Sequence, residues 1–239
     1  MEARHRGATL YTPGEQRGGL RQRDFLAHVA ASLPVPPKAP GAGSWCVYAD
    51  ALEAAWRAHR ARNGTLAEVG SSTSSLSAAD AEGNMVALTY TLLDHFGAGI
   101  TLPETGLALN NGVSYFDPRP DLRTSMAGGK RINASDMVPT VAVRDGRALF
   151  AVGASGGDLI MPCVSQIAAL MLDFDLSPEA AFHSPTLDAS HRGCLRADRL
   201  RLQGRAAARR RPGRRAGGAA QGGRRGDPRQ DQRAGGARR

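Results

Sequence analysis

Two segments of the chain carry apolar residues at the spacing of an α-helix. In residues 48–62, Leu52, Ala55 and Trp56 recur on one side and charged residues occupy the other, which predicts an amphipathic helix. Residues 159–174 are apolar at helical spacing and begin just after Gly156–Gly157. This pattern predicts a helix that is buried in the core of the protein.

Other segments have the apolar runs and turn residues of β-strands. Residues 86–92 alternate after a turn at residues 82–84, and further short strands are expected around Thr73. A second hairpin is predicted for the apolar runs 138–144 and 147–153. Asp145–Gly146 joins these runs and tolerates the positive φ angles of a type I′ turn.

Ser, Pro and Gly residues elsewhere in the chain predict a short capped helix and an extended linker. Ser177 is typical of an N-cap with Pro178 at the first helical position, which predicts a helix to about His183. Residues 1–45 mix Gly, Pro and Arg without sustained periodicity, and residues 34–43 are typical of a linker. Strands followed by helices, rather than strict alternation, indicate an α+β layered domain.

The net positive charge of the chain is concentrated at its C-terminal end. The net charge is +9, but residues 197–239 hold about 14 arginines against three acids, or roughly +11. Residues 1–196 are therefore close to neutral. The tail of Arg, Gly, Ala and Gln has too few apolar residues to form a core, which predicts disorder. Nucleic-acid binding has only this charge behind it, so no specific nucleic-acid partner is expected.

The rest of the composition is that of a single domain with no cofactor. The 239 residues are 41% apolar, no apolar run approaches the roughly 18 residues of a membrane span, and residues 1–16 have no signal-peptide core. We therefore expect no membrane partner and, by default, a cytoplasmic location. The three cysteines form no CxxC pair and the histidines have no ligand spacing, so no metal site is predicted.

Two groups of residues compete as the source of a nucleophile. The first is Gly153–Gly157, which fits the G-x-S-x-G nucleophile elbow with Ser155 as the nucleophile. Asp175 or Asp188 and then His191 follow in the order of a serine hydrolase. That fold needs several βαβ units upstream, where this sequence offers a linker, a helix and hairpins. A glycine turn leading from a strand into a helix explains the same residues.

The second group is a series of separated motifs that starts at a run of serines around Thr73. The motifs are Ser71–Asp80, Glu82–Thr91, Phe96–Gly97, Leu102–Gly106, Leu109–Gly112, Gly129–Arg131, Met137–Thr140 and Gly153–Gly157. In this order they resemble the small subunit of the γ-glutamyltransferase (γ-glutamyltranspeptidase) family. The resemblance covers about residues 46–196.

The resemblance implies a fold and a division of the chain. The implied fold is the four-layer αββα sandwich of an N-terminal-nucleophile hydrolase, here incomplete. Residues 46–72 are similar to the end of the large subunit, residues 73–196 to the catalytic small subunit, and 1–45 and 197–239 lie outside it. The precursor is expected to cut itself between Ser72 and Thr73, after which the two fragments associate as a heterodimer.

The chemistry of such a threonine can be stated from its groups. A threonine hydroxyl is a weak nucleophile, and cleavage frees an α-amine on the same residue that can act as its base. The reference pKa of an α-amine is about 7.7–8.0, so part of it is unprotonated near neutral pH. The resemblance assigns the nucleophile to Thr73, sets the hydroxyl of Thr91 beside it, and gives oxyanion stabilisation to the backbone of Gly156 and Gly157.

Substrate-binding positions match the family less well. Glu104, Asn110 and Asn111 match, whereas Leu93, Gly112 and Tyr115 replace the asparagine, glutamine and acid that hold the donor. Ser135–Asp136 aligns imperfectly with a Ser-Ser pair that binds a carboxylate, and an acid there would repel that group. The amino-group clamp is therefore missing or rebuilt.

Three functions remain open. The first is a γ-glutamyltransferase-like amide hydrolase or acyltransferase, which passes the acyl group of a small γ-glutamyl donor such as glutathione from Thr73 to water or an amine. The second is a glutaryl- or cephalosporin-type acylase of the same superfamily. The third is an inactive, truncated fragment, because most of the large subunit is absent. A serine esterase built on Ser155 is the weakest alternative.

Overall fold

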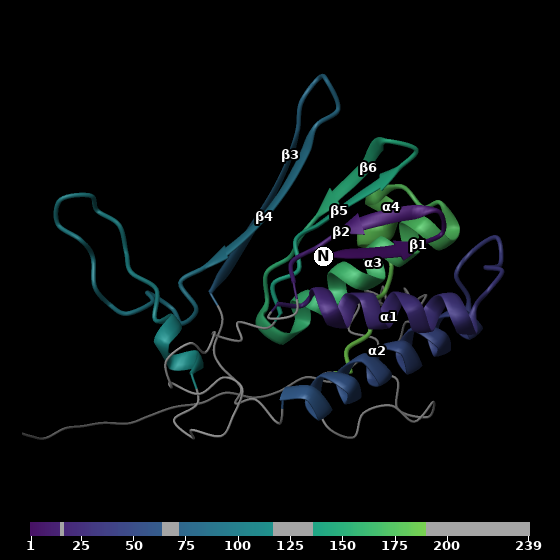
Figure 1. The fold of residues 1–239 in the computed structure, drawn as a ribbon, viewed down its shortest axis with the longest axis horizontal. Helices are drawn as coiled ribbons and strands as arrows, with labels where there is room; N and C mark the ends of the chain where they lie inside the picture. Colours follow the sequence, from purple (N-terminus) through teal and green to yellow (C-terminus); the bar gives the residue numbers. More distant parts are fainter. Residues whose placement is uncertain (15–16, 64–71, 117–135, 190–239) are drawn as a thin grey trace, which may run out of the picture. The chain divides into compact units, whose positions relative to one another are not determined.

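The computed structural model describes residues 1–14, 17–63, 72–116 and 136–189, and all of these belong to one compact unit (Figure 1). Antiparallel sheets and helices are both present, so the α+β class predicted from the sequence is confirmed. The predicted disorder of residues 197–239 concerns a segment outside the described residues.

The larger sheet has four antiparallel strands in the order β1-β2-β5-β6. The strands are β1 (Glu2–His5), β2 (Ala8–Tyr11), β5 (Thr140–Arg144) and β6 (Arg147–Val152). Strand β2 pairs with β5, so a hairpin from the beginning of the chain extends a hairpin from its second half.

Within the described part of the chain, four α-helices accompany this sheet. They are α1 (Gly19–Ser32), α2 (Ala42–Asn63), α3 (Ile160–Phe174) and α4 (Pro178–His183). Helix α1 packs against α2, α3 and β1, and α4 packs against α3. Figure 1 shows α1 and α2 running side by side.

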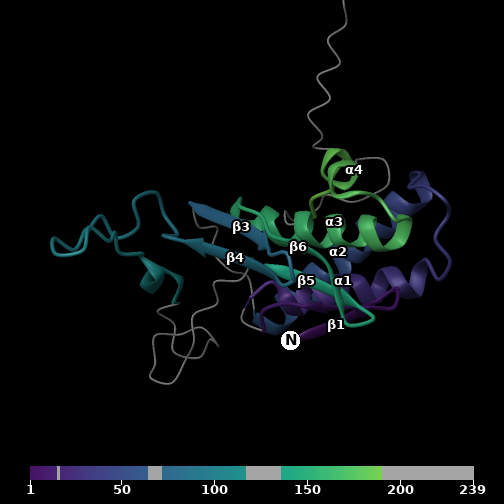
Figure 2. The same ribbon diagram turned by 90° about the horizontal axis from the view of Figure 1, so that it is seen from above.

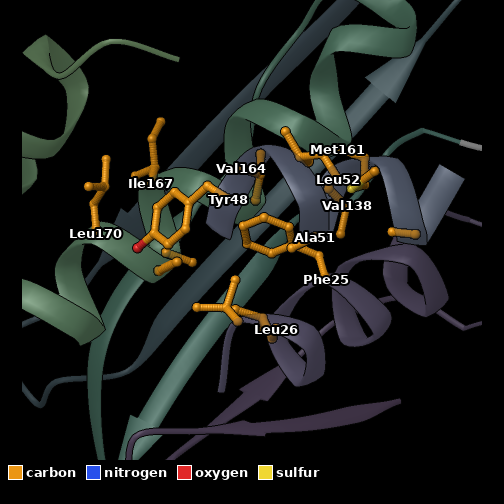
Figure 3. Close-up of a cluster of buried hydrophobic side chains, with 14 of the residues drawn as sticks. Phe25, Leu26, Tyr48, Ala51, Leu52, Val138, Met161, Val164, Ile167 and Leu170 are labelled. Carbon is orange, nitrogen blue, oxygen red and sulfur yellow. The ribbon is translucent and has the colours of Figure 1, made fainter. Parts of the chain in front are cut away.

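Apolar side chains from α1, α2 and α3 meet in one cluster, which Figure 3 shows in close-up. Its labelled members are Phe25, Leu26, Tyr48, Ala51, Leu52, Val138, Met161, Val164, Ile167 and Leu170. Each fully buried side chain of this size contributes about 1.5–3 kcal/mol relative to an exposed one. This cluster therefore supplies much of the stabilisation that holds the three helices together.

Several elements agree with the sequence predictions. The predicted amphipathic helix is α2, and the predicted buried helix is α3. In the β5–β6 turn, Asp145 and Gly146 have φ angles of 52° and 75°, as a type I′ turn requires. The Ser177 hydroxyl accepts a hydrogen bond from the Ala180 N–H at 3.2 Å, so it is the N-cap of α4.

The first 45 residues differ from the linker that the sequence predicts. They contain β1, β2 and α1, and only the stretch from Leu33 to Gly41 connects helices without regular structure. The sequence pattern does not predict α1, because two of its buried side chains, Arg21 and Gln22, are polar. Their burial removes the apolar stripe on which the prediction of a helix depends.

A second sheet consists of one hairpin, β3 (Thr73–Ala79) and β4 (Met85–Thr91). These are the strands expected around Thr73 and in residues 86–92. One face of the hairpin carries hydroxyl groups, and the other exposes Leu76, Val86, Leu88 and Tyr90 by about half of each residue's surface. The hairpin contacts β5 and β6, and Figure 2 shows it alongside β6.

One segment of the described residues, Gly157–Phe174, has the length and hydropathy of a membrane-spanning helix. It includes the whole of α3, and 61% of the segment is buried inside the protein. The core helix of a folded domain has these same properties.

A buried carboxylate ties the N-terminal hairpin to two helices. Asp173 of α3 accepts hydrogen bonds from His5 Nε2, Arg6 Nε and Tyr48 OH, each at 2.7 Å, and the side chains of His5 and Asp173 are fully buried. Burial raises the pKa of Asp173, but the partners outweigh it and hold the pKa below its ordinary value. Burial and the nearby carboxylate raise the pKa of Tyr48 above its ordinary range, so Tyr48 stays neutral and donates.

We predict that Asp173→Asn destabilises the protein by about 3 kcal/mol at pH 7, because it removes the negative charge to which His5, Arg6 and Tyr48 donate. The folded-state pKa of Asp173 lies below the ordinary value of about 3.9. The stabilisation is therefore present above that pH and is lost as the pH falls through the folded-state pKa.

Urea unfolding at pH 7 and below pH 4 measures this effect. The difference between the wild type and Asp173→Asn should shrink at the lower pH. Asp50→Asn, on the exposed side of α2, is the matched control and should stay within about 0.5 kcal/mol of the wild type. A loss of stability that does not depend on pH would contradict this account of Asp173.

Candidate active site

Thr73 and Thr91 are directly opposite each other, as the first residue pair (rung) of the β3–β4 hairpin. The antiparallel register places their Cα atoms opposite one another, and the Thr73 hydroxyl donates to the Thr91 hydroxyl at 3.2 Å. Both side chains are partly buried. The two threonines that the sequence analysis selected 18 residues apart are therefore in direct contact.

The hydroxyl of Thr91 also contacts the peptide bond that precedes Thr73. It donates a hydrogen bond to the Ser72 carbonyl oxygen at 2.8 Å and accepts one from the Leu93 N–H at 2.8 Å. Thr91 thus accepts from the Thr73 hydroxyl and donates to the carbonyl group next to it. This arrangement raises the electron density of the Thr73 oxygen and polarises the Ser72 carbonyl.

The backbone just beyond Thr91 completes this arrangement. The Leu93 carbonyl accepts a hydrogen bond from the Ser72 N–H at 2.6 Å. Leu93 has a φ angle of 76°, in the left-handed region that is unfavourable for a residue with a branched side chain, and it is 7% exposed. The same residue therefore fixes both Ser72 and the Thr91 hydroxyl through its backbone.

Asn110 and Asn111 support the loop that adjoins this backbone. Asn111 accepts from the Asp94 N–H at 3.0 Å, donates its side-chain N–H to the Asp94 carboxylate, and donates its backbone N–H to the Leu92 carbonyl at 3.2 Å. The Asn110 side-chain oxygen accepts from the Gly112 N–H at 2.8 Å. Both asparagines therefore shape the loop, whereas Glu104 lies exposed in a turn of the segment between them and β4.

Gly156 and Gly157 lie where β6 leads into α3. Both have positive φ angles, 126° and 57°, which favour glycine over any other residue. A short 3-10 turn, Gly157–Leu159, runs directly into α3. Their backbone N–H groups consequently lie at the N-terminal end of a 15-residue helix, where the helix dipole favours negative charge.

Asp136 has a different environment from the substrate-facing one that the sequence indicates. It is 8% exposed and forms an ion pair with Arg21, which is fully buried in α1 and lies 4.3 Å from the Trp56 ring centroid. Burial lowers the pKa of Arg21 to about 9, while the charge of Asp158 acts in the opposite direction. The Arg21 cation balances the negative charge of Asp136. This is the charge that would repel a substrate carboxylate if Asp136 faced the substrate. Ser135 lies outside the described residues.

The nucleophile elbow around Ser155 lacks one of its proposed partners. Ser155 precedes α3, and Asp175 is the C-cap of the same helix. A helix of 15 residues is about 22 Å long, so Asp175 cannot reach Ser155. His191 lies outside the described residues.

Sequence reasoning missed a second hydroxyl pair on the same face of the hairpin. Ser75 and Thr89 are opposite each other, with their hydroxyl oxygens 3.1 Å apart, and Gly153 approaches them closely. The signal was the repetition of hydroxyl residues two positions apart on both strands, at 73 and 75 and at 89 and 91.

The fold of this chain is shared with a solved enzyme structure, and its sequence matches a family model. A cephalosporin acylase from Bacillus halodurans shares the fold with a TM-score of 0.61 and 20% identity, over 77% of this chain and 39% of that one. The family model for gamma-glutamyltranspeptidase matches residues 48–205. The chain therefore belongs to the gamma-glutamyltranspeptidase family, as the motif series predicts.

Curated relatives include both acylases and glutathione hydrolases. The chain is 36% identical over 141 residues to the acylase ACY 1 proenzyme of Pseudomonas sp. (strain SE83), covering 58% of this chain and 25% of that protein. It is 34% identical over 122 residues to the glutathione hydrolase proenzyme of Escherichia coli (strain K12), covering 47% and 21%. The chain thus spans a fifth to a quarter of the length of these relatives.

We predict that Asp136→Ala destabilises the protein by about 3–5 kcal/mol, because it leaves the buried Arg21 cation without its carboxylate. The double variant Arg21→Met/Asp136→Ala removes both charges and should be more stable than Asp136→Ala alone. Urea unfolding of the wild type, Arg21→Met, Asp136→Ala and the double variant gives the coupling between the two residues. A double variant as unstable as the sum of the single ones would indicate that the pair is not coupled.

Proposed function

We propose that this chain contains the nucleophile-bearing part of an amide hydrolase or acyltransferase of the γ-glutamyltranspeptidase type. In this proposal Thr73 becomes the N-terminal nucleophile when the bond between Ser72 and Thr73 is cut. The observation that carries it is the continuous hydrogen-bond path from the Thr73 hydroxyl to Thr91 and from Thr91 to the Ser72 carbonyl.

Self-cleavage uses this path in two steps. The Thr73 hydroxyl oxygen attacks the Ser72 carbonyl carbon, the C–N bond breaks, and the released amine takes up the proton that the hydroxyl loses. The product is an ester between Ser72 and the Thr73 side chain. Water then hydrolyses this ester, which gives a carboxylate on Ser72 and a free hydroxyl and a free amine on Thr73. Throughout, the Thr91 hydroxyl orients the nucleophile and polarises the carbonyl.

The mature reaction repeats this chemistry on a substrate amide. The free α-amine of Thr73 accepts the hydroxyl proton as the oxygen attacks the amide carbon, and the amine of the substrate leaves. Water or an acceptor amine then takes the acyl group from Thr73. The N–H groups of Gly156 and Gly157, at the start of α3, are the proposed donors to the tetrahedral oxyanion that forms both in self-cleavage and in the mature reaction.

A larger assembly is part of the proposal. In it, the two sheets with α1, α2 and α3 form part of an αββα sandwich. The fragments on either side of the cut stay associated as a heterodimer. The exposed apolar face of the β3–β4 hairpin supports this view, because it lacks a covering layer among the described residues.

The acyl donor is proposed to be a γ-glutamyl compound or a related glutaryl-type amide. Leu93 replaces the asparagine that the family resemblance expects to hold the donor, and Asn110 and Asn111 are engaged in shaping their own loop. The positions of the described residues that match the amino-group clamp of the family do not carry its residues, and this favours a donor without the α-amino group. The likeness to a protein named an acylase supports the glutaryl alternative.

We predict that the purified full chain yields two fragments that separate between Ser72 and Thr73. Thr73→Ala should abolish the cut because it removes the attacking oxygen, whereas Ser155→Ala should retain it. A denaturing gel with mass spectrometry of the fragments measures both. Cleavage that persists in Thr73→Ala would rule out the proposed nucleophile, and an uncut wild-type chain would contradict self-processing.

We predict that Thr91→Val slows this cleavage on the order of 10²-fold, the usual effect of removing one donor to a reacting carbonyl. Valine keeps the shape of threonine but removes the contacts with Thr73, Ser72 and Leu93. A time course of fragment formation measures the rate. Thr101→Val is the control, because Thr101 is exposed in the following loop, and it should cleave as fast as the wild type.

We predict that a processed, active preparation hydrolyses glutaryl anilides with a higher kcat/KM than γ-glutamyl anilides, because the described site has no clamp for the α-amino group. Parallel assays of the two anilides over the same concentrations measure the ratio. A clear preference for the γ-glutamyl anilide would show that other residues rebuild the clamp.

A further inference from the structure

The second hydroxyl pair of the hairpin lies one rung away from the proposed nucleophile. Thr73 pairs with Thr91 and Ser75 with Thr89, and residues two apart on a strand point to the same face. The Ser75 hydroxyl is 3.1 Å from the Thr89 hydroxyl and donates to the Leu88 carbonyl at 3.3 Å. The two pairs form a continuous polar face. The proposed chemistry uses only Thr73 and Thr91 of this face and assigns no role to Ser75 and Thr89.

This second rung is in tight contact with Gly153. A Cβ atom at position 153 would lie 2.1 Å from the Ser75 hydroxyl oxygen and 3.1 Å from that of Thr89. The backbone of Gly153 is not in the positive-φ region, so conformational freedom is not what requires glycine there. A Cβ at this position would instead force the Ser75 hydroxyl to turn out of its hydrogen bonds with Thr89 and the Leu88 carbonyl.

Gly153 joins the hairpin to the segment that carries the oxyanion donors. It follows the last residue of β6, Val152, which is 4% exposed, and precedes Ala154, which packs against the main core. Gly156 and Gly157 are only three and four residues further along the chain. A displacement of Gly153 away from the hairpin therefore moves the glycine pair relative to Thr73.

We propose that Gly153 and the hydroxyl pair of Ser75 and Thr89 form a spacer that sets the position of Gly156–Gly157 relative to the Thr73–Thr91 pair. This inference rests on the proposed function for its consequence in the reaction, but the contact itself does not. Gly153, Ser75 and Thr89 are positioning residues, because they act on the reacting groups through the backbones of β6 and the hairpin.

The test compares the full wild-type chain with Gly153→Ala, Ser75→Ala and the double variant Ser75→Ala/Gly153→Ala. The rate of cleavage between residues 72 and 73 and the Tm are measured for each. Gly153→Ala should lower the Tm and, in the folded protein, slow cleavage on the order of 10²-fold, the effect of a displacement of about 1 Å at a reacting group. The double variant should regain much of both losses, because the 2.1 Å contact is removed and the Ser75 Cβ lies 3.4 Å from the added carbon, at an ordinary contact distance. The contact with the Thr89 hydroxyl at 3.1 Å remains and needs a shift of only a few tenths of an ångström.

Gly43→Ala is the matched control. Gly43 lies in α2, and a Cβ there meets no atom within 4 Å. This variant should keep the Tm or raise it slightly and should cleave at the wild-type rate. Should Gly153→Ala fail to fold, folding of the double variant supports the spacer by the same reasoning.

The outcomes separate the spacer from the proposed function. A Gly153→Ala chain with the wild-type Tm and cleavage rate overturns the spacer, and so does a double variant no better than Gly153→Ala. A wild-type chain that is never cut refutes self-processing. In that case the Tm values still decide on the spacer: a loss in Gly153→Ala that Ser75→Ala restores supports it, and no loss overturns it.

Discussion

The register between β3 and β4 is the constraint on which the candidate site depends. Thr73 is opposite Thr91 only in this pairing, because a shift of one residue would place Tyr90 across from Thr73 and turn one hydroxyl to the other face. The turn at residues 80–84 sets the pairing. The Asp80 side chain accepts from the backbone and side-chain N–H groups of Asn84, at 2.8 and 2.7 Å, and these bonds hold the pKa of Asp80 below its ordinary value. A local turn thus decides which hydroxyls meet at the other end of the hairpin.

The two halves of the site have different structural origins. The hydroxyl pairs belong to a hairpin with one exposed apolar face, whereas Gly156 and Gly157 are fixed by β6 and α3, which are anchored in the main core. Burial of β6 and α3 in the main core therefore anchors the elements on either side of the glycine segment. The hairpin and the main sheet meet along β5 and β6, and the contact at Gly153 is the one next to the glycine segment. In the proposed spacer, hydroxyl groups set the distance at this contact.

Much of the fold could be predicted where local rules act alone. The Asp145–Gly146 turn and the Ser177 cap follow from backbone preferences, and α3 is recognisable because it is apolar on nearly every side. The N-terminal hairpin could not be predicted, since β1 buries His5 and pairs it with Asp173, 168 positions away. Likewise, the contact between Asp136 and Arg21 spans 115 residues, and no local pattern indicates that the acid turns toward the core. The sequence motifs identified Thr73 and Thr91, but the spacer role of Gly153 depends on a contact between strands far apart in the chain.

The backbone and the side chain of Leu93 have separate roles in the candidate site. Its backbone N–H and carbonyl hold the Thr91 hydroxyl and Ser72, and these contacts do not depend on the side chain. The left-handed conformation that they require costs a residue such as leucine about 1–2 kcal/mol. Burial of the leucine side chain, which is 7% exposed, returns about 1.5–3 kcal/mol, so the strained backbone is retained. The backbone of Leu93 holds the geometry around Thr73, whereas the side chain at this position would contact the acyl donor. The geometry can therefore persist although the leucine side chain is unable to form a hydrogen bond to the acyl donor.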